Sequence, residues 1–141
     1  MYVIFIEIGE WNLTGISALD KYRQPEEDST LDRLLDLDDE ILVMGQGYWV
    51  EIHATRVPPT PEKSHGIDYS LCLFDPDGER LVGYDNAHAV RVKARSRKRT
   101  ATYDHVHKRK RVKPYRYSNA ETLVNDFWTD VERILKERGI P

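Results

Sequence analysis

Two groups of reactive side chains flank a strongly basic stretch in the second half of the chain. One lies at residues 84–88, which read Tyr-Asp-Asn-Ala-His, and the other at residues 103–109, which read Tyr-Asp-His-Val-His-Lys-Arg. If the second group is extended, the side chains of His105 and His107 project from one face, because successive side chains of a strand alternate. The spacing therefore predicts two imidazoles within reach of each other, beside several cations.

Cleavage of RNA through its own 2′-hydroxyl is a reaction that such a set can perform. It needs a base for the hydroxyl proton, an acid for the departing 5′-oxygen, and positive charge on the phosphate. Histidine titrates near neutral pH and can take either proton-transfer role. We therefore predict a metal-independent site in which His105 and His107 are the acid/base pair, while Asp85 and Asn86 orient a histidine or the ribose.

Two other interpretations of the histidine pair stay open. A His-x-His pair on a strand can present two ligands to zinc or a similar metal, with Asp85 or His88 as a third. The two histidines can also simply extend a basic surface or make ordinary surface hydrogen bonds. The predicted ribonuclease site uses no metal and no cofactor.

The distribution of charge favours a nucleic-acid partner. Residues 91–116 hold twelve of the 21 Lys and Arg residues and one acid, a net charge of +11, whereas residues 1–40 carry −8. Such a concentration attracts polyanions, and each neutralised phosphate releases condensed counterions. A solvated or localisation-type basic run is the alternative explanation. The predicted nucleic-acid-binding residues are Arg91, Lys93, Arg95, Arg97, Lys98, Arg99, Lys108, Arg109, Lys110 and Arg111.

The composition is that of one folded domain. The 141 residues are 40% hydrophobic with a net charge of only −3, which excludes disorder as a description of the whole chain. Cys72, the single cysteine, excludes a disulfide scaffold and fits a reducing compartment. The apolar opening at residues 2–6 is far shorter than the ~20 residues of a membrane span, so we expect a cytoplasmic protein without a membrane partner. The absence of P-loop, GxGxxG, HExxH and GxSxG motifs argues against most nucleotide hydrolases and serine hydrolases.

Apolar alternation and turn residues predict a series of strands. They lie at residues 2–8, 41–44, 48–57, 67–74 and 79–84, with a further short strand at 114–117. The turn sequences at residues 45–47 and 75–78 join neighbouring strands as antiparallel hairpins. Leucines at residues 31–37 indicate a short helix.

A long helix is predicted at the C-terminus. Ser118 and Glu121 have the spacing of a capping box, and Gly139 is placed to end the helix. Apolar residues then recur at steps of three and four: Leu123, Val124, Phe127, Trp128, Val131, Ile134 and Leu135. We expect this face to pack on the sheet rather than to bind a cofactor. The predicted fold class is α+β, an antiparallel meander packed by a long C-terminal helix, with residues 1–141 as a single domain.

Several short motifs, in their order along the chain, resemble the TumE-type toxin family. They lie at residues 47–52, 65–71, 84–88, 103–107, 120–123 and 126–128. The resemblance covers about residues 40–138 and leaves residues 1–30 as a variable acidic N-terminal extension. It implies a growth-inhibiting toxin encoded beside a helix-turn-helix antitoxin. The matching family positions are Asp85, Asn86, His88, His105 and His107, and through this match His88 joins the catalytic candidates.

Together these observations lead us to expect a toxin-like, RNA-directed protein that acts as an endoribonuclease. A ribonuclease role rests on analogy with other small toxins. The alternative is a non-catalytic nucleic-acid-binding module with a polybasic loop. A further hypothesis pairs the acidic N-terminal segment with the basic segment, within one chain or across a homodimer, or lets an acidic antitoxin surface occupy the same basic patch.

Overall fold

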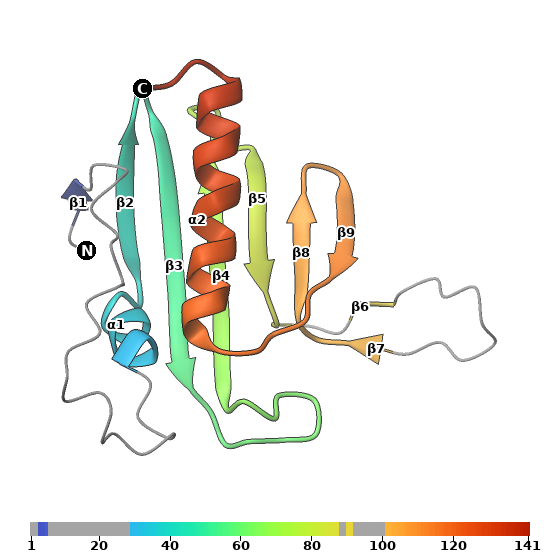
Figure 1. Cartoon of the computed structure of the whole chain (residues 1–141). Helices are drawn as coiled ribbons and strands as arrows, with labels where there is room; N and C mark the ends of the chain where they lie inside the picture. The colour runs from blue at the N-terminus through green and yellow to red at the C-terminus, as the bar shows by residue number, and fades with distance from the viewer. Residues whose placement is uncertain (1–2, 6–28, 88–89, 92–100) are drawn as a thin grey trace.

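A seven-stranded sheet is the main element of the computed structural model, which describes residues 3–5, 29–87, 90–91 and 101–141 (Figure 1). Its strand order is β1-β2-β3-β4-β5-β8-β9, and all neighbours are antiparallel except β1 and β2, which are parallel. The strands are β1 (Val3–Phe5), β2 (Glu40–Gly45), β3 (Tyr48–Arg56), β4 (Ile67–Phe74), β5 (Arg80–Asp85), β8 (His105–Lys108) and β9 (Arg111–Pro114). The predicted α+β class and its antiparallel meander are confirmed. The strand β1 lies within the predicted strand at residues 2–8, but its parallel pairing with β2 was not predicted.

The first two hairpins form where turn residues predict them. Between β2 and β3, Gly45 and Gly47 have φ values of 96° and 84°, a region that glycine enters without a steric cost. Between β4 and β5, Asp75 Oδ1 accepts hydrogen bonds from the backbone N–H groups of Asp77 and Glu79, at 3.0 and 2.9 Å. These local bonds fix the turn that places β5 against β4.

The third hairpin joins β8 and β9 and corrects one prediction. A two-residue turn places Lys108 opposite Arg111, so the pairing runs from there to Pro114, which lies opposite His105. The strand therefore ends where the prediction of a strand at 114–117 begins, and that prediction is wrong. The position of this strand depends on its partner rather than on its own apolar pattern.

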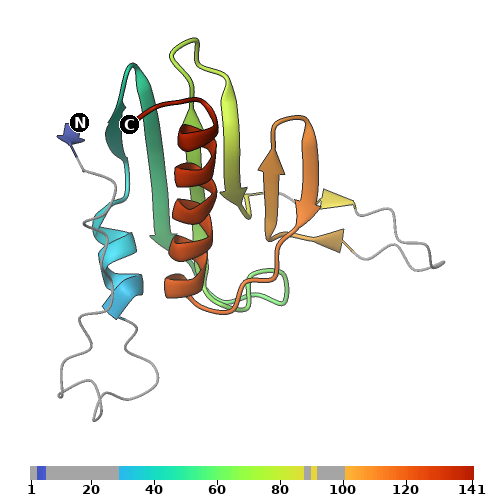
Figure 2. The same ribbon diagram turned by 45° about the horizontal axis from the view of Figure 1, so that its top comes forward.

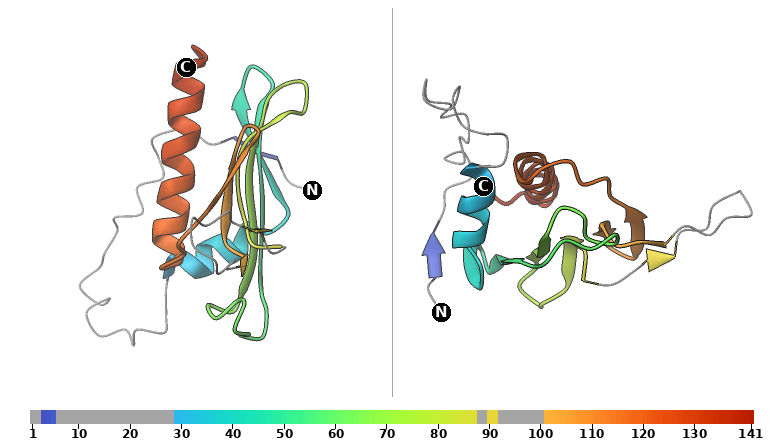
Figure 3. Two further views of the ribbon diagram at one scale, coloured as in Figure 1. Left: turned by 90° about the vertical axis from the view of Figure 1, so that its right-hand side faces the viewer. Right: turned by 90° about the horizontal axis from the view of Figure 1, so that it is seen from below.

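Both helices pack on the same face of the sheet (Figures 2 and 3). They are α1 (Ser29–Asp36), at the predicted short helix, and α2 (Ala120–Glu137). The core between α2 and the sheet includes the fully buried side chains of Val50, Leu71, Leu73, Val82, Leu123, Phe127 and Val131. The opposite face of the sheet carries no helix in the described part of the chain. Neither of these two helices is long and apolar enough to cross a membrane.

The N-cap of the helix α2 lies one residue after the predicted N-cap. Asn119, not Ser118, is the N-cap: its Oδ1 accepts a hydrogen bond of 2.8 Å from the backbone N–H of Thr122. With this start, Ala120 is the first helical residue and is fully buried, so packing selects between two adjacent capping residues. Gly139 has a φ of 70° just after the helix, as its predicted stopping role requires.

A small second sheet interrupts the meander between β5 and β8. It consists of β6 (Val90–Arg91) paired antiparallel with β7 (Ala101–Thr102). Because these strands belong to a separate sheet, β5 and β8 become direct neighbours although they are far apart along the chain. This long-range pairing creates the candidate site.

Candidate functional site

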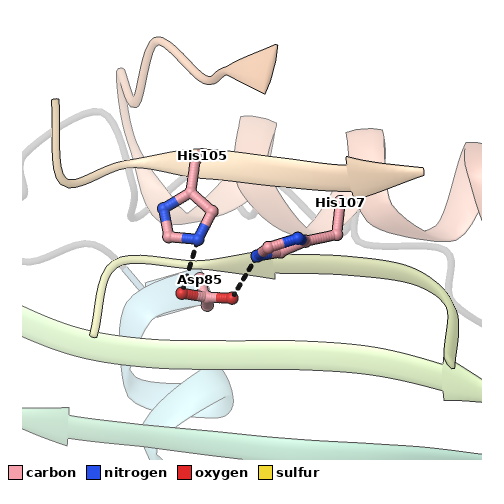
Figure 4. A group of neighbouring side chains, drawn as sticks. All are labelled: Asp85, His105 and His107. Carbon is pink, nitrogen blue, oxygen red and sulfur yellow. Dashed lines mark ion pairs between the residues drawn. The ribbon is translucent and has the colours of Figure 1, made fainter. Parts of the chain in front are cut away.

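Asp85, His105 and His107 converge on the face of the sheet opposite α2. In the β5–β8 pair Asp85 lies opposite His105, and Gly83 lies opposite His107. Directly opposed residues share a face, so the carboxylate and both imidazoles project to the same side. His105 Nε2 lies 2.9 Å from Asp85 Oδ1, and His107 Nε2 lies 3.4 Å from Asp85 Oδ2 (Figure 4).

The hydrogen bond that Nδ1 of His105 makes shows that this nitrogen carries a proton. Nδ1 of His105 lies 2.7 Å from the backbone carbonyl oxygen of Tyr103. A carbonyl oxygen only accepts hydrogen bonds, so Nδ1 carries a proton and donates it. The ring is thereby oriented with Nε2 toward Asp85, and the residue is fully buried, with 0% of its surface exposed.

Arg80, which the sequence did not single out, completes the described surroundings of Asp85. Arg80 Nη1 lies 4.0 Å from Asp85 Oδ2, on the same side as His107. The Arg80 side chain crosses the sheet above Gly83, where an added Cβ atom would lie 3.0 Å from Arg80 Cδ and 3.1 Å from Cys72 Sγ. A glycine inside an otherwise regular strand was the available signal for this close approach.

Asn86 is positioned by the backbone of β4. Its Oδ1 accepts a hydrogen bond of 3.0 Å from the N–H of Tyr69, and its Nδ2 donates one of 2.8 Å to the carbonyl of Ile67. The residue is fully buried. Its amide therefore ties the end of β5 to the start of β4, directly beside Asp85, which supports a positioning role rather than contact with a ribose.

A second histidine–carboxylate pair, missed by the sequence analysis, anchors the segment before β8. His65 Nε2 lies 3.0 Å from Asp104 Oδ1, and the Tyr69 hydroxyl donates a hydrogen bond of 2.8 Å to the same oxygen. Burial, followed by the charge of Asp104, raises the pKa of the Tyr69 hydroxyl, so it remains a donor. Because Asp104 lies between Tyr103 and His105, these contacts fix the backbone carbonyl that holds the His105 ring.

The predicted basic residues divide between described and undescribed parts of the chain. Lys108 lies on β8, Arg109 and Lys110 form the exposed turn, and Arg111 is exposed on β9. Arg91 belongs to β6 by its backbone. The remaining predicted site residues lie outside the described residues: His88, Lys93, Arg95, Arg97, Lys98 and Arg99.

Lys108 points to the helix side of the sheet, away from the histidines. Its Nζ lies 3.0 Å from Asp130 Oδ2, which also accepts a hydrogen bond of 2.6 Å from the Tyr84 hydroxyl. Arg133 Nη2 lies 3.1 Å from the other oxygen of Asp130. Burial alone would raise the pKa of the Asp130 carboxyl, but the hydrogen bonds from Tyr84, Lys108 and Arg133 outweigh burial and hold it below its ordinary value.

A basic pocket of about 340 Å³ opens beside Lys108, between the turn after β8 and the end of α2. Its charged lining residues are Lys108, Arg109, Arg133, Glu137 and Arg138. Two of them were predicted to bind nucleic acid, whereas Arg133 and Arg138 were missed because α2 was interpreted only as a packing element. Lys108 and Arg133 pair with Asp130, and Arg133 also pairs with Glu137, so Arg109 and Arg138 are the lining cations that these two acids leave for an anionic group.

Comparison with known proteins connects this site to a family. Residues 17–135 match the family described as Toxin TumE, a span that includes Asp85, His105, His107 and the basic hairpin. The match begins well before residue 40, where the motif resemblance begins. No curated protein and no solved structure matches the chain. Since the matched span covers most of the sequence, the chain belongs to the TumE family of toxins.

Proposed function

We propose that this toxin of a toxin–antitoxin system acts on RNA as an endoribonuclease, with Asp85, His105 and His107 as its reactive centre. The observation that carries the proposal is the convergence of two imidazoles on one carboxylate, at 2.9 and 3.4 Å. The family supplies the role of toxin and hence an antitoxin partner. The helix-turn-helix character of the antitoxin, homodimerisation and a cytoplasmic location stay predictions.

The cost of building this cluster supports a functional rather than a stabilising role. Asp85 and His105 are 5% and 0% exposed, and burial of ionisable groups costs free energy that ion pairing only partly offsets. Apolar side chains at the same positions would stabilise the sheet at least as well. Clusters of buried, mutually interacting ionisable groups are typical of functional sites.

Burial assigns different roles to the two histidines. The His107 side chain retains 13% exposure, although its Nε2 is buried beside Asp85, and the His105 side chain retains none, so we give the contact with the substrate and the proton transfer to His107. His105, held between the Tyr103 carbonyl and Asp85, positions the carboxylate. Asp85 in turn orients His107. This proposal keeps His107 of the predicted acid/base pair and gives His105 a positioning role instead.

The β8–β9 hairpin is suited to hold the RNA backbone. Strand register places Lys108 and Arg111 on the helix side, whereas His105 and His107 lie on the open side. β9 is exposed along its whole length and forms the edge of the sheet, so an RNA strand that passes over it contacts both sides. Arg109 and the basic pocket extend this path.

The test is cleavage of RNA by the full chain and by a His107→Gln variant. We expect the variant to cut at least about 100-fold more slowly, the effect of losing one acid–base group. His53→Gln is the matched control, because His53 lies on the same sheet face and its side chain is 53% exposed. Intact RNA with the wild-type chain, or equal rates for the wild type and His107→Gln, would overturn the proposal.

A non-catalytic RNA-binding module is the second candidate. The specific observation that favours it is the basic pocket, which lies on the other side of the sheet from the histidines. Its signature would be RNA that binds with a steep salt dependence and is recovered uncut, with affinity lowered by Arg138→Ala but not by His107→Gln.

A further inference from the structure

We infer that Asp85, His105 and His107 form a binding site for one divalent metal ion of the zinc class. The inference deepens the proposed function, on which it rests only for the link to RNA cleavage. Metal binding itself is a separate property and is tested separately. It replaces the proton-transfer role given to His107 under the proposed function with metal ligation, the alternative that the sequence left open.

The positions of the three ligand atoms suit a single ion. One atom from each side chain can be chosen so that all three lie within 4.8 Å of one another. An ion bound through bonds of about 2.0–2.2 Å holds neighbouring ligand atoms about 2.9–3.5 Å apart. The nitrogen–oxygen separations of 2.9 Å from His105 and 3.4 Å from His107 fall in that range, each to a different oxygen of the Asp85 carboxylate.

The tautomer of His105 favours the same conclusion. Because Nδ1 donates its proton to the Tyr103 carbonyl, Nε2 is the ring nitrogen that faces a carboxylate oxygen 2.9 Å away. A metal ion can take the place of a proton between this nitrogen and the carboxylate oxygen. A backbone carbonyl that accepts the far N–H of the ring is also the usual outer contact of a metal-binding histidine.

The outer contacts extend to the carboxylate and to the backbone behind it. Asp85 Oδ1 accepts a hydrogen bond of 3.4 Å from the N–H of Ala87, and Asn86 fixes the end of β5. Asp104, held by His65 and Tyr69, fixes the strand that carries both histidines. The ligands are thus preorganised by contacts that the ion does not have to create.

Among the described residues, Arg80 is a cation that approaches this site without binding the carboxylate directly. Its Nη1 lies 4.0 Å from Asp85 Oδ2, beyond hydrogen-bonding distance, and its side chain is 37% exposed. A long, partly exposed side chain can withdraw when an ion binds. It can then meet the phosphate of a substrate beside the ion.

The donor set indicates the class of metal. Two imidazole nitrogens and one carboxylate suit zinc and neighbouring transition metals, whereas magnesium and calcium prefer oxygen ligands throughout. Three protein ligands leave at least one position for water. An ion here would lower the pKa of that water and withdraw charge from a phosphate oxygen, as in metal-assisted hydrolysis.

Another group of potential ligands provides an internal control. Asp38, Asp39 and His53 also bring ligand atoms together, with His53 Nδ1 2.8 Å from Asp39 Oδ1. The side chains of His53 and Asp39 are 53% and 81% exposed, so their pairing is that of an ordinary surface ion pair. Exposure and partners distinguish the two groups, although their residue types are similar.

The experiment is a titration of the chelator-treated full chain with Zn²⁺ by calorimetry, with Co²⁺ absorption as a second readout. We expect one ion per chain, a visible Co²⁺ spectrum of imidazole coordination, and at least about a tenfold loss of affinity in Asp85→Asn and His107→Gln. His53→Gln should bind as the wild type does. Circular dichroism checks the fold, and because His107 is partly exposed, His107→Gln tests the inference even where Asp85→Asn does not fold.

The outcomes separate this inference from the proposed function. The absence of saturable Zn²⁺ binding, or binding unchanged in His107→Gln, overturns the metal site. If such a chain still cuts RNA in EDTA, the proposed ribonuclease stands while the metal site fails. If Zn²⁺ binds through these ligands but RNA stays intact with the metal-loaded chain, the metal site stands while the proposed ribonuclease fails.

Discussion

Side chains on the two faces of strand β8 contact two carboxylates, Asp130 of α2 and Asp85 of β5, whose partners differ in chemistry. On the helix side, Asp130 accepts hydrogen bonds from Tyr84, Lys108 and Arg133. On the open side, Asp85 faces the Nε2 atoms of two histidines. His107 and Lys108 are adjacent on β8 but project to opposite faces of the sheet. Lys108 therefore contributes to the contact between sheet and helix, whereas His107 belongs to the candidate reactive centre.

The difference lies in the partners. Lysine, arginine and tyrosine carry their protons at neutral pH, so the Asp130 network is complete without any further group. Imidazole nitrogens can exchange protons and bind metal ions, so the Asp85 group offers chemistry that the Asp130 network does not. A saturated network stabilises, whereas one built on titratable nitrogens is suited to chemistry.

The comparison is tested most directly by replacing each carboxylate with its amide. Asp85→Asn removes the charge that organises the histidines, and we expect RNA cleavage to fall at least about 100-fold. The matched variant Asp130→Asn should retain cleavage close to wild type per folded molecule. A loss of cleavage that is larger in Asp130→Asn than in Asp85→Asn would reverse the assignment of the two sides.

Asp130→Asn should also lower the stability of the fold. Asp130→Asn leaves Lys108 and Arg133 without their carboxylate; because both are partly exposed, we expect a loss of about 1–3 kcal/mol in the free energy of unfolding. Urea denaturation measures this loss. An unchanged midpoint and slope would show that the Asp130 network does not stabilise the fold.

The same carboxylate predicts a dependence on pH. The folded pKa of Asp130 lies below its ordinary value of 3.8, so its contribution is fully present above that value and is lost as the pH falls through the folded pKa. Wild-type stability should therefore decline more steeply below about pH 4 than that of Asp130→Asn. Parallel declines in the two proteins would contradict the network.

Gly83→Ala tests whether the open side depends on the path of Arg80. The new Cβ atom meets both Arg80 and Cys72, and we expect a cost of about 1 kcal/mol in unfolding free energy. In an Arg80→Ala background the cost should be smaller, because one of the two contacts is gone. An equal cost in both backgrounds would assign the strain to Cys72 alone.

The smallest expected effect concerns the two-residue turn between β8 and β9. Arg109 has a φ of 55°, which a side chain disfavours and glycine tolerates. Arg109→Gly should raise stability by about 0.5–1 kcal/mol while lowering the salt dependence of RNA binding by about one phosphate contact. An unchanged salt slope would remove Arg109 from the RNA path.

Local patterns in the sequence were sufficient for much of the fold. The glycine-rich turn, the Asp75 turn and the apolar face of α2 are set by neighbours within a few residues, and all form as predicted. The shared face of His105 and His107 also follows from alternation alone. The first residue of α2 was missed by one position, because Ser118 and Asn119 are both able to cap and packing selects between them.

The site needed the tertiary structure. Asp85 meets His105 only because β5 and β8 pair across the β6–β7 excursion, and the register of that pair has no local signature. Arg80 and His65 were missed for the same reason, since each meets its partner through contacts between different elements or across a strand face. Arg133 and Arg138 were missed because α2 was interpreted only as a packing element. The sequence by itself determined which residues could do chemistry and which strand face the histidines share. Only the long-range register decided that one buried carboxylate lies between them, because pairing distant strands depends on packing the whole sheet.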